Sequence, residues 1–387
     1  MIYLDNAATT FPKPKIVKDS ITEWVETGVG SPGRGSQGAA IKADSRVLKV
    51  RKHLAKFFGV IDEFRIIFTY SATDALNLGI KGFVERGDHV IISSIEHNSV
   101  LRPLRHLEMD GIITLDIVAS DKDGYIDVEQ LWQKFTDKTK LVVISHASNV
   151  LGSVQPITEI GQGVRERGAY LLVDAAQTAG VLSTNLDELN ADMLACAGHK
   201  GLFGLPGTGL LILGERIQKL ESWRQGGTGY NSESEFQPIN WPEKFEAGTL
   251  NMPGIISLGK GVEFIESEGI EQIMKREHQH FEMLWEGLSG IPNIRLYGPN
   301  PDQPRVAVLS MNIDGWEPDD VADILQHNYQ IQVRSGLQCS PLAHQVIGTH
   351  PEGTVRISPG YFTETKEIKR LINAIKNTAM TQVDWMF

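Results

Sequence analysis

The stretch AYLLVDAA, Ala169–Ala176, decides the fold class of this 387-residue chain. It is almost continuously apolar rather than alternating, which is typical of a strand buried on both faces of a sheet. Helical patterns such as Thr73–Glu85 and Ile157–Arg167 separate it from similar runs. Strands that alternate with helices predict an α/β fold, a mostly parallel seven-stranded sheet with helices on both faces. The expected strands are Arg65–Tyr70, His89–Ile95, Ile113–Ala119, Lys140–Ala147, Ala169–Ala176, Met193–Gly198 and Gly209–Gly214.

The pattern changes after residue 250. Two helical periods, Ile256–Glu268 and Ile270–Gly290, precede shorter strand and helix patterns. We therefore expect a large α/β domain at 15–250 and a smaller C-terminal α+β domain at 251–387. The segment Gly226–Pro242 has no clear period and is interpreted as a long loop or hairpin. The other elements expected in the smaller domain are strands Arg305–Ile313, Ile331–Arg334 and Thr354–Ser358, and helices Pro318–His327 and Glu364–Thr378.

Composition excludes several classes of function. Lys and Arg number 37 against 48 Asp and Glu, and this net charge of −11 argues against nucleic acid as a partner. No apolar run reaches the ~18 residues of a membrane span, and the N-terminus lacks the pattern of a secretion signal. With two cysteines and no His or Cys cluster at ligand spacing, we expect neither a disulfide scaffold nor a metal site. These features predict a cytoplasmic protein without a membrane partner.

Polar side chains follow several of the expected strands. Thr73, His97 and Asn149 come after the first, second and fourth strands, Asp174 lies in the fifth, and Lys200 follows the sixth. Taken singly, Thr73 or Asp174 suits a helix cap and Lys200 a solvated turn. Because the carboxyl ends of parallel strands form one crevice, we expect these side chains to lie together.

That set of residues suits pyridoxal phosphate. This cofactor needs a lysine to bind its aldehyde, an acid beside its ring nitrogen, and donors for its phosphate. A nicotinamide cofactor would require Gly-x-Gly-x-x-Gly in the first strand–helix turn, whereas the Gly-rich run Gly201–Gly214 comes late in the sheet. The residues therefore favour pyridoxal phosphate chemistry over hydride transfer.

Motifs in a consistent order from residue 3 to residue 358 carry a resemblance to a known family. They are YLDNAATT (3–10), EHNS (96–99), HASNVLG (146–152), DAAQ (174–177), GHK (198–200), FEAGT (245–249), RSGLQC (334–339) and VRIS (355–358). The chain resembles the cysteine desulfurases and selenocysteine lyases, class V aminotransferase-like enzymes of fold type I. The resemblance implies a pyridoxal-phosphate-dependent transferase fold, with segment 1–14 packed near the active site.

The resemblance also implies roles around the cofactor. Lys200 would bind it covalently and shuttle the substrate Cα proton. Asp174 would pair with the pyridine nitrogen, Gln177 would donate to the phenolic oxygen, and His97 would stack on the ring and assist proton transfer. The phosphate ligands would be Thr73, His199 and, from the neighbouring subunit of a homodimer, Thr249.

For the substrate, the resemblance implies that Asn149 and Arg356 bind the carboxylate, with Arg334 nearby, and that Cys339 is the nucleophile. Cys339 would take sulfur from L-cysteine as a persulfide, leaving L-alanine. The compact connection from Arg334 to Cys339 resembles the group in which an acceptor protein or a reductant takes the sulfur. Such roles extend to iron–sulfur cluster biogenesis.

Two positions depart from the family pattern. Many desulfurases have Ser before Gly198 and Thr before Thr73, where this chain has Ala197 and Ala72. Two hydroxyl donors are therefore missing. We expect the phosphate contacts to depend on Thr73, His199, backbone amides and Ser71.

The two cysteines differ in their surroundings. Cys196 lies in an apolar run, where a small buried side chain fits. Cys339 lies between Gly336 and Ser340-Pro341, five residues after Arg334. A loop bounded by Gly and Pro beside a cation can expose a thiol and lower its pKa. The residues alone leave burial and reactivity open for Cys339, and the resemblance favours the nucleophile.

Two alternative functions are compatible with the same family fold. A selenocysteine or cysteine/cystine C–S lyase would release selenide or sulfide with little use of Cys339. A more distant alternative is a non-catalytic sulfur carrier or assembly scaffold, which would have no need to keep Lys200, Asp174 and His97. Sulfur and selenium substrates differ by one atom, and the sequence does not choose between them.

Overall fold

The computed structural model describes residues 1–28, 30, 32, 38–230 and 233–381. In this part of the chain the large domain contains a seven-stranded sheet in the order β2-β8-β7-β6-β5-β3-β4. β8 pairs antiparallel with both neighbours, and the other strands run in one direction. The predicted sheet is confirmed, and Ala169–Ala176 supplies its central strand, β6. The strands are β2 (Ile66–Thr69), β3 (His89–Ser93), β4 (Thr114–Val118), β5 (Thr139–Ser145), β6 (Tyr170–Asp174), β7 (Met193–Ala197) and β8 (Gly209–Leu213).

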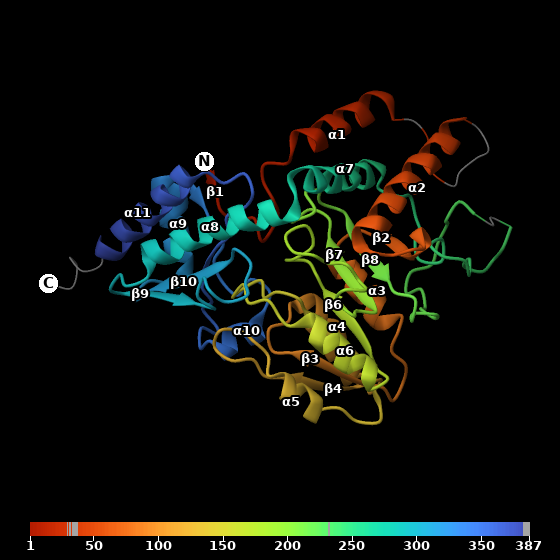
Figure 1. Cartoon of the computed structure of the whole chain (residues 1–387), viewed down its shortest axis with the longest axis horizontal. Coiled ribbons are helices and arrows are strands. Elements are labelled where there is room, and N and C mark those ends of the chain that lie inside the picture. Colours follow the sequence, from red (N-terminus) through yellow and green to blue (C-terminus); the bar gives the residue numbers. More distant parts are fainter. Residues whose placement is uncertain (29, 31, 33–37, 231–232, 382–387) are drawn as a thin grey trace.

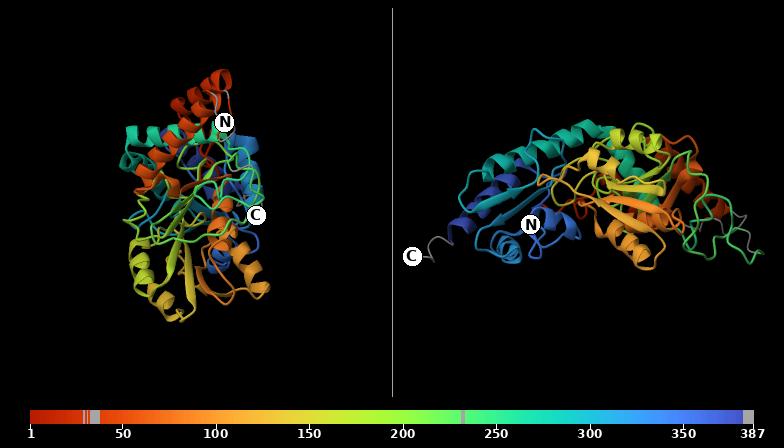
Figure 2. Two further views of the ribbon diagram at one scale, coloured as in Figure 1. Left: turned by 90° about the vertical axis from the view of Figure 1, so that its right-hand side faces the viewer. Right: turned by 90° about the horizontal axis from the view of Figure 1, so that it is seen from below.

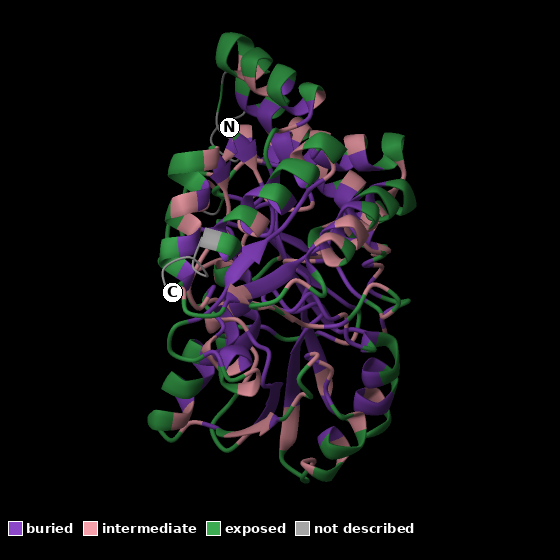
Figure 3. Cartoon of the chain, turned by 90° about the vertical axis from the view of Figure 1, so that its left-hand side faces the viewer, coloured by how far each residue is buried: buried purple, intermediate pink, exposed green. Residues whose placement is uncertain are grey.

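Alternate residues of the strands enter two separate hydrophobic cores. In β6, Leu171 and Val173 belong to one core and Leu172 to the other. Helices therefore cover both faces, and Figure 3 shows buried strands between helices whose outer sides are exposed. The first core includes α2 (Gly38–Phe58), α5 (Val128–Gln133), α6 (Ile157–Glu166) and α7 (Met252–Glu268), and the second includes α3 (Ala72–Lys81) and α4 (Asn98–Met109).

Helix α3 differs from its expected bounds for a local reason. The helix was expected over Thr73–Glu85, but it begins at Ala72 because Ser71 is its N-cap. The Asp74 amide donates to Ser71 Oγ at 3.1 Å. The interpretation of Thr73 as the cap is therefore wrong. Helices α1 (Lys15–Thr27) and α4 were not predicted at all; Pro103 lies within α4 and interrupts the sequence pattern.

The smaller domain is built on an antiparallel sheet in the order β12-β10-β9. The expected strand Arg305–Ile313 begins only at Leu309, because the backbone before it bonds to the loop after β5: the Val306 amide donates to the Gly152 carbonyl. The described residues of Gly226–Pro242 form no helix or strand, as expected. The elements of the smaller domain are β9 (Ile294–Tyr297), β10 (Leu309–Ile313), β11 (Ile331–Gln332), β12 (Val355–Ile357), α8 (Ile270–Leu288), α9 (Pro318–Tyr329), α10 (Pro341–Val346) and α11 (Thr365–Thr381).

Two segments connect the domains. Helix α7 packs into the core of the large sheet through Ile255, Leu258 and Val262. The long helix α8 then leads into the smaller domain (Figure 1). Strand β1 (Ile2–Tyr3) pairs in parallel with β11, so the N-terminus lies on the smaller domain. The division at residue 250 stays a prediction, and the packing of α7 favours a boundary after that helix.

The two domains lie side by side in an elongated molecule, as Figure 2 shows from below. The helices in the described residues include none long and apolar enough to cross a membrane.

Candidate active site

A cavity of about 190 Å³ lies at the carboxyl ends of the parallel strands. It is lined by residues that follow β2, β3, β5, β6 and β7, because those strands end at the same edge of the sheet. The described residues that line it do not include Thr249, Arg334, Arg356 or Cys339. The predicted site residues that it brings together are Thr73, His97, Asn149, Asp174, Gln177, His199 and Lys200.

Lys200 and Asp174 are two ionisable groups of this cavity whose pKa values are shifted by burial. Burial lowers the pKa of Lys200 to about 8, although the carboxylate of Asp174 acts in the opposite direction. Burial likewise raises the pKa of Asp174, against the backbone hydrogen bond that Oδ1 accepts from the Ala176 amide at 2.9 Å. A lysine with a lowered pKa is a nucleophile and base near neutral pH.

A chain of hydrogen bonds joins His97 to Thr73. His97 caps α4, and its Nδ1 accepts from the Ser99 amide at 3.0 Å, so the ring proton lies on Nε2. Ser99 Oγ lies 2.8 Å from His97 Nδ1 and 2.7 Å from Thr73 Oγ1. Burial lowers the pKa of His97 to about 4, with Lys200 adding to the effect. Sequence reasoning missed Ser99, although a serine two residues after a strand-end histidine was a visible signal.

The phosphate end of the expected site is formed by the N-terminus of α3. Ser71, Ala72 and Thr73 line the cavity there, where helix amides and the helix dipole favour an anion. Ala197 also lines the cavity, so both departures from the family pattern face the same space. Nδ1 of His199 is buried with no hydrogen-bond partner among the described residues.

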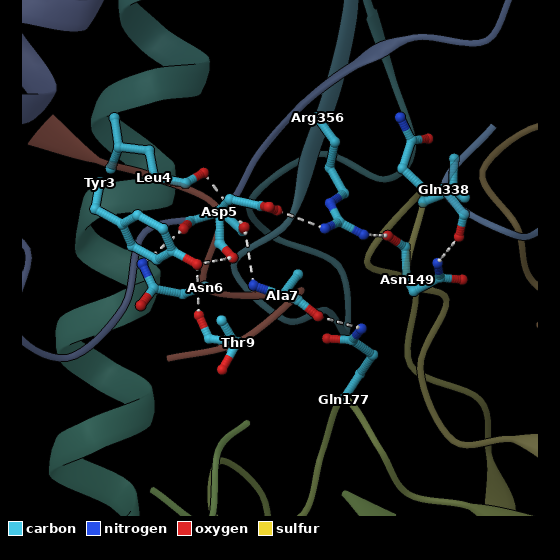
Figure 4. A network of polar contacts seen from close by, with 12 residues as sticks. Tyr3, Leu4, Asp5, Asn6, Ala7, Thr9, Asn149, Gln177, Gln338 and Arg356 are labelled. Carbon is cyan, nitrogen blue, oxygen red and sulfur yellow. Dashed lines mark hydrogen bonds and ion pairs between the residues drawn. The ribbon is translucent and has the colours of Figure 1, made fainter. Parts of the chain in front are cut away.

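The N-terminal segment brings a carboxylate to Arg356. Arg356 Nη2 donates to Asp5 Oδ1 at 2.7 Å, and both side chains are buried (Figure 4). Its Nη1 donates to the Asn149 carbonyl at 3.1 Å, which links it to the cavity wall. Gln177 Nε2 donates to the Ala7 carbonyl at 3.1 Å. A substrate carboxylate bound by Arg356 would therefore share the guanidinium with Asp5.

The same N-terminal segment fixes the turn that carries Lys200. Thr10 Oγ1 donates to the Lys200 carbonyl at 3.0 Å, and Lys13 Nζ donates to the His199 carbonyl at 2.7 Å. Burial lowers the pKa of Lys13 to about 8. The turn is thus held by residues almost two hundred positions earlier in the chain.

Cys339 lies on a loop, residues 334–340, that is attached to the cavity through its backbone. We call this segment the Cys339 loop. The Asn98 amide donates to the Cys339 carbonyl at 2.7 Å, and Asn149 Nδ2 donates to the Gln338 carbonyl at 2.7 Å. Ser340 Oγ donates to Asn149 Oδ1 at 2.6 Å. The Asn149 side chain, expected to bind substrate, is thus engaged at both ends with the loop. The Cys339 residue itself is exposed.

The remaining candidates lie outside the cavity of this chain. Arg334 is exposed and exchanges backbone hydrogen bonds with Arg356. Thr249 is exposed, and its carbonyl accepts from the Tyr70 hydroxyl at 3.3 Å. Cys196 is fully buried in β7, and burial raises the pKa of its thiol. Its expected role as a core side chain agrees with this placement.

Glu96 is a second residue that sequence reasoning missed. It is fully buried beside His97 and accepts from the Ser145 amide at 2.9 Å and from Ser145 Oγ at 2.7 Å. Burial raises the pKa of Glu96 to about 7, against these hydrogen bonds and the one from Ser93. The carboxyl group joins the ends of β3 and β5 and so fixes the strand end that carries His97.

Comparisons with known proteins agree with this geometry. The family model described as aminotransferase class-V matches residues 2–371. A probable cysteine desulfurase of Methanothermobacter thermautotrophicus is 34% identical over 98% of this chain and 94% of its own length. A cysteine desulfurase of Escherichia coli O157:H7 is 30% identical over 97% of this chain and 93% of its own.

Among solved structures, the apo cysteine desulfurase from Thermococcus onnurineus NA1 superposes with a TM-score of 0.91. It is 32% identical, and the match covers 98% of this chain and 95% of that one. Both the family model and these relatives extend over nearly the whole length, including every strand end that lines the cavity. The chain therefore belongs to the aminotransferase class-V family, in which its relatives are cysteine desulfurases.

Proposed function

We propose that this protein is a pyridoxal-phosphate-dependent cysteine desulfurase that converts L-cysteine to L-alanine and takes up the sulfur on Cys339. One observation carries the proposal: direct hydrogen bonds join the cavity lined by Lys200, Asp174 and His97 to the loop that carries the exposed Cys339. Asn98 and Asn149 make these bonds, and Asn149 also lines the cavity. Relatives at 30–34% identity that are named cysteine desulfurases support the same reaction.

The cavity suits the cofactor on which this family generally depends, pyridoxal phosphate. The unpartnered, buried Nδ1 of His199 and the amides at the start of α3 offer donors to a phosphate. Lys200 would hold the aldehyde carbon, and Asp174 would pair with the pyridine nitrogen. When bound, the cofactor supplies an electron sink for the substrate Cα.

Lys200 has the proton-transfer role in this proposal. Near neutral pH its Nζ is neutral in a far larger fraction than that of an ordinary lysine, because burial lowers its pKa to about 8. A neutral amine can take the substrate Cα proton and return it later to the product. His97 lines the cavity and carries its ring proton on Nε2, because its Nδ1 accepts a hydrogen bond from the Ser99 amide.

Arg356 would bind the substrate carboxylate. Its guanidinium is buried and already oriented by Asp5 and the Asn149 carbonyl. Its Nε is buried without a hydrogen-bond partner among the described residues, which leaves a donor for an incoming carboxylate. Asn149 would contribute by orienting the Cys339 loop as well as by facing the substrate.

Cys339 would accept the sulfur. Its thiolate attacks the substrate sulfur, an S–S bond forms, and the C–S bond breaks with its electron pair left on the carbon. That carbon then takes a proton, and alanine leaves. The persulfide on Cys339 stays exposed on the loop, where a sulfur-acceptor protein or a reductant can reach it.

The proposal includes a homodimer. Thr249, expected to bind the phosphate, does not line the cavity of its own chain, which is the arrangement required if a second copy supplies it. Measuring the mass in solution, and mixing Thr249→Ala chains with Lys200→Ala chains, tests this. A dimer with partial recovery of activity in the mixture supports it; a monomer with full activity contradicts it.

The deciding experiment is a single turnover with L-cysteine, followed by intact-mass analysis. We expect one added sulfur per chain, on Cys339. The competing function is a cysteine or selenocysteine lyase, favoured by the finding that Cys339 does not line the cavity. Alanine formed without any protein-bound sulfur, and at full rate in Cys339→Ser, would establish the lyase instead.

A further inference from the structure

His344 is a buried side chain to which the proposed reaction gives no task. It lies on α10, directly after the Cys339 loop, and it is fully buried. Its Nε2 lies 2.9 Å from Gln338 Oε1, and its Nδ1 lies 2.7 Å from Thr349 Oγ1. Because an amide oxygen only accepts, Nε2 carries the ring proton and donates it to Gln338. Burial lowers the pKa of His344 to about 4, so the ring is neutral at physiological pH.

The backbone conformation of Gln338 needs support from surrounding contacts. Its φ is +43° and that of Cys339 is +61°, so two successive non-glycine residues lie in the left-handed region. Such conformations cost free energy and persist only where surrounding contacts fix them. The Gln338 side chain is buried and held at both ends, since its Nε2 donates to the Thr354 carbonyl at 2.9 Å.

The next two residues of the loop are attached to different elements. The Cys339 carbonyl accepts from the Asn98 amide, and Ser340 Oγ donates to Asn149 Oδ1. Each of the residues 338–340 is therefore bonded to a residue outside the loop, and Gln338 and Ser340 share Asn149 as a partner. Among the described contacts of the Gln338 side chain, His344 is the ionisable partner.

We propose that His344 is a positioning residue: through Gln338 it holds the Cys339 loop in its left-handed conformation against the start of α4. The role of Cys339 as the sulfur acceptor rests on the proposed function. The effect of His344 on the loop conformation does not, because it is a property of the folded chain in the absence of substrate.

Hydrogen exchange at the Asn98 amide reports the proposed contact directly, because that amide donates to Cys339. Two variants of similar chemistry separate the loss of the hydrogen bond to Gln338 from the loss of the imidazole ring itself. His344→Gln keeps a donor where Nε2 lies, whereas His344→Asn keeps only a group near Nδ1, toward Thr349. In His344→Asn we expect exchange at Asn98 to rise about tenfold, since Gln338 Oε1 loses its donor at 2.9 Å and keeps only the longer contact with Thr354 Oγ1 at 3.4 Å. His344→Gln should stay within about twofold of the wild type.

Controls make the outcome specific. Gln345→Ala changes an exposed residue of the same helix and should leave Asn98 exchange unchanged. Leu101 and Leu104, further along α4, should exchange alike in all variants. If His344→Asn does not fold, Gln338→Asn replaces it, because Asn tolerates the left-handed region and is too short to reach His344. Equal exchange in His344→Asn and wild type, or equal rises in both His344 variants, would overturn the proposal.

A second readout connects the loop to sulfur transfer. In single turnovers at saturating L-cysteine, His344→Asn should slow persulfide formation about tenfold, because the thiol is displaced, while the absorbance band of the cofactor bound at Lys200 stays unchanged. His344→Gln should restore the rate. If the wild type forms no persulfide, the proposed function fails, and the exchange measurement still decides whether His344 holds the loop.

Discussion

The cavity around Lys200 and the Cys339 loop lie next to each other but are built by different means. Five strand ends supply the cavity, and each of its predicted residues follows its strand within a few positions. The Cys339 loop has no sheet to place it. Its conformation depends on hydrogen bonds from Asn98, Asn149 and His344, which belong to other elements. Topology positions the first region, and individual side-chain contacts position the second.

The two regions also differ in their electrostatics. Burial shifts the pKa of Lys200 and of His97 away from their ordinary values. Cys339 is exposed, whereas the protein's other cysteine is buried in the sheet. Proton chemistry is thus concentrated in the buried region and sulfur chemistry in the exposed one. Sulfur transfer needs both regions, but a variant in one region should leave the local structure and the intrinsic reactivity of the other unchanged.

The largest effect is expected from Lys200→Ala. Loss of the amine removes proton transfer at Cα, which alone costs about 10²–10⁴-fold in alanine formation. The covalent absorbance band of the cofactor should vanish as well, while Cys339 still reacts with thiol reagents. Alanine formation and the absorbance spectrum measure this, with the exposed Lys219→Ala as the matched control. Near-normal turnover in Lys200→Ala would contradict the role given to the cavity.

The two cysteines sharpen the contrast between exposed and buried regions. Cys339→Ser should abolish protein-bound sulfur after a single turnover and leave the free energy of unfolding unchanged. Cys196→Ser places an unpartnered hydroxyl in the core and should cost about 1–3 kcal/mol of stability while sulfur is still captured. Intact mass and denaturant unfolding give both quantities. Sulfur found on Cys196 instead would reverse the assignment.

Asp5→Ala tests the link between the two regions. It leaves the buried Arg356 guanidinium without its carboxylate partner, and removal of one partner from a buried pair costs about 3–5 kcal/mol. We expect a lower unfolding midpoint in urea and a higher KM for cysteine, because Arg356 loses its orientation. Asp137→Ala, at an exposed position, is the control. An unchanged midpoint would show that Asp5 and Arg356 are not coupled.

The smallest effect is a pH dependence of cofactor capture. Only the neutral amine of Lys200 attacks an aldehyde, and burial lowers the pKa of Lys200 to about 8. The capture rate should therefore be low below that pH, rise through it and level off above it. Stopped-flow absorbance after adding pyridoxal phosphate to the apo protein measures the rate. Because Asp174 raises this pKa, Asp174→Asn should move the midpoint to lower pH; a midpoint unmoved or moved upward counts against the pairing.

Much of the large domain could be predicted from local patterns. Runs of mostly apolar residues such as Ala169–Ala176 identified all seven strands, because strands buried on both faces of a sheet are largely apolar along their length. Helix α4 escaped prediction although it is amphipathic, because Pro103 lies inside it and proline usually ends a helix. Strand β9 was missed because it is short and only half buried, so its pattern is faint.

The sequence by itself determined which residues would meet at the cavity, since the direction of parallel strands brings their carboxyl ends to one edge. It also separated Cys196, in an apolar run, from Cys339, beside Gly and Pro. Only the tertiary structure decided that Asp5 engages Arg356 and that Asn149 is bonded to the Cys339 loop. Those contacts join residues up to 351 positions apart, and a hydrogen bond over such a separation leaves no local pattern to read.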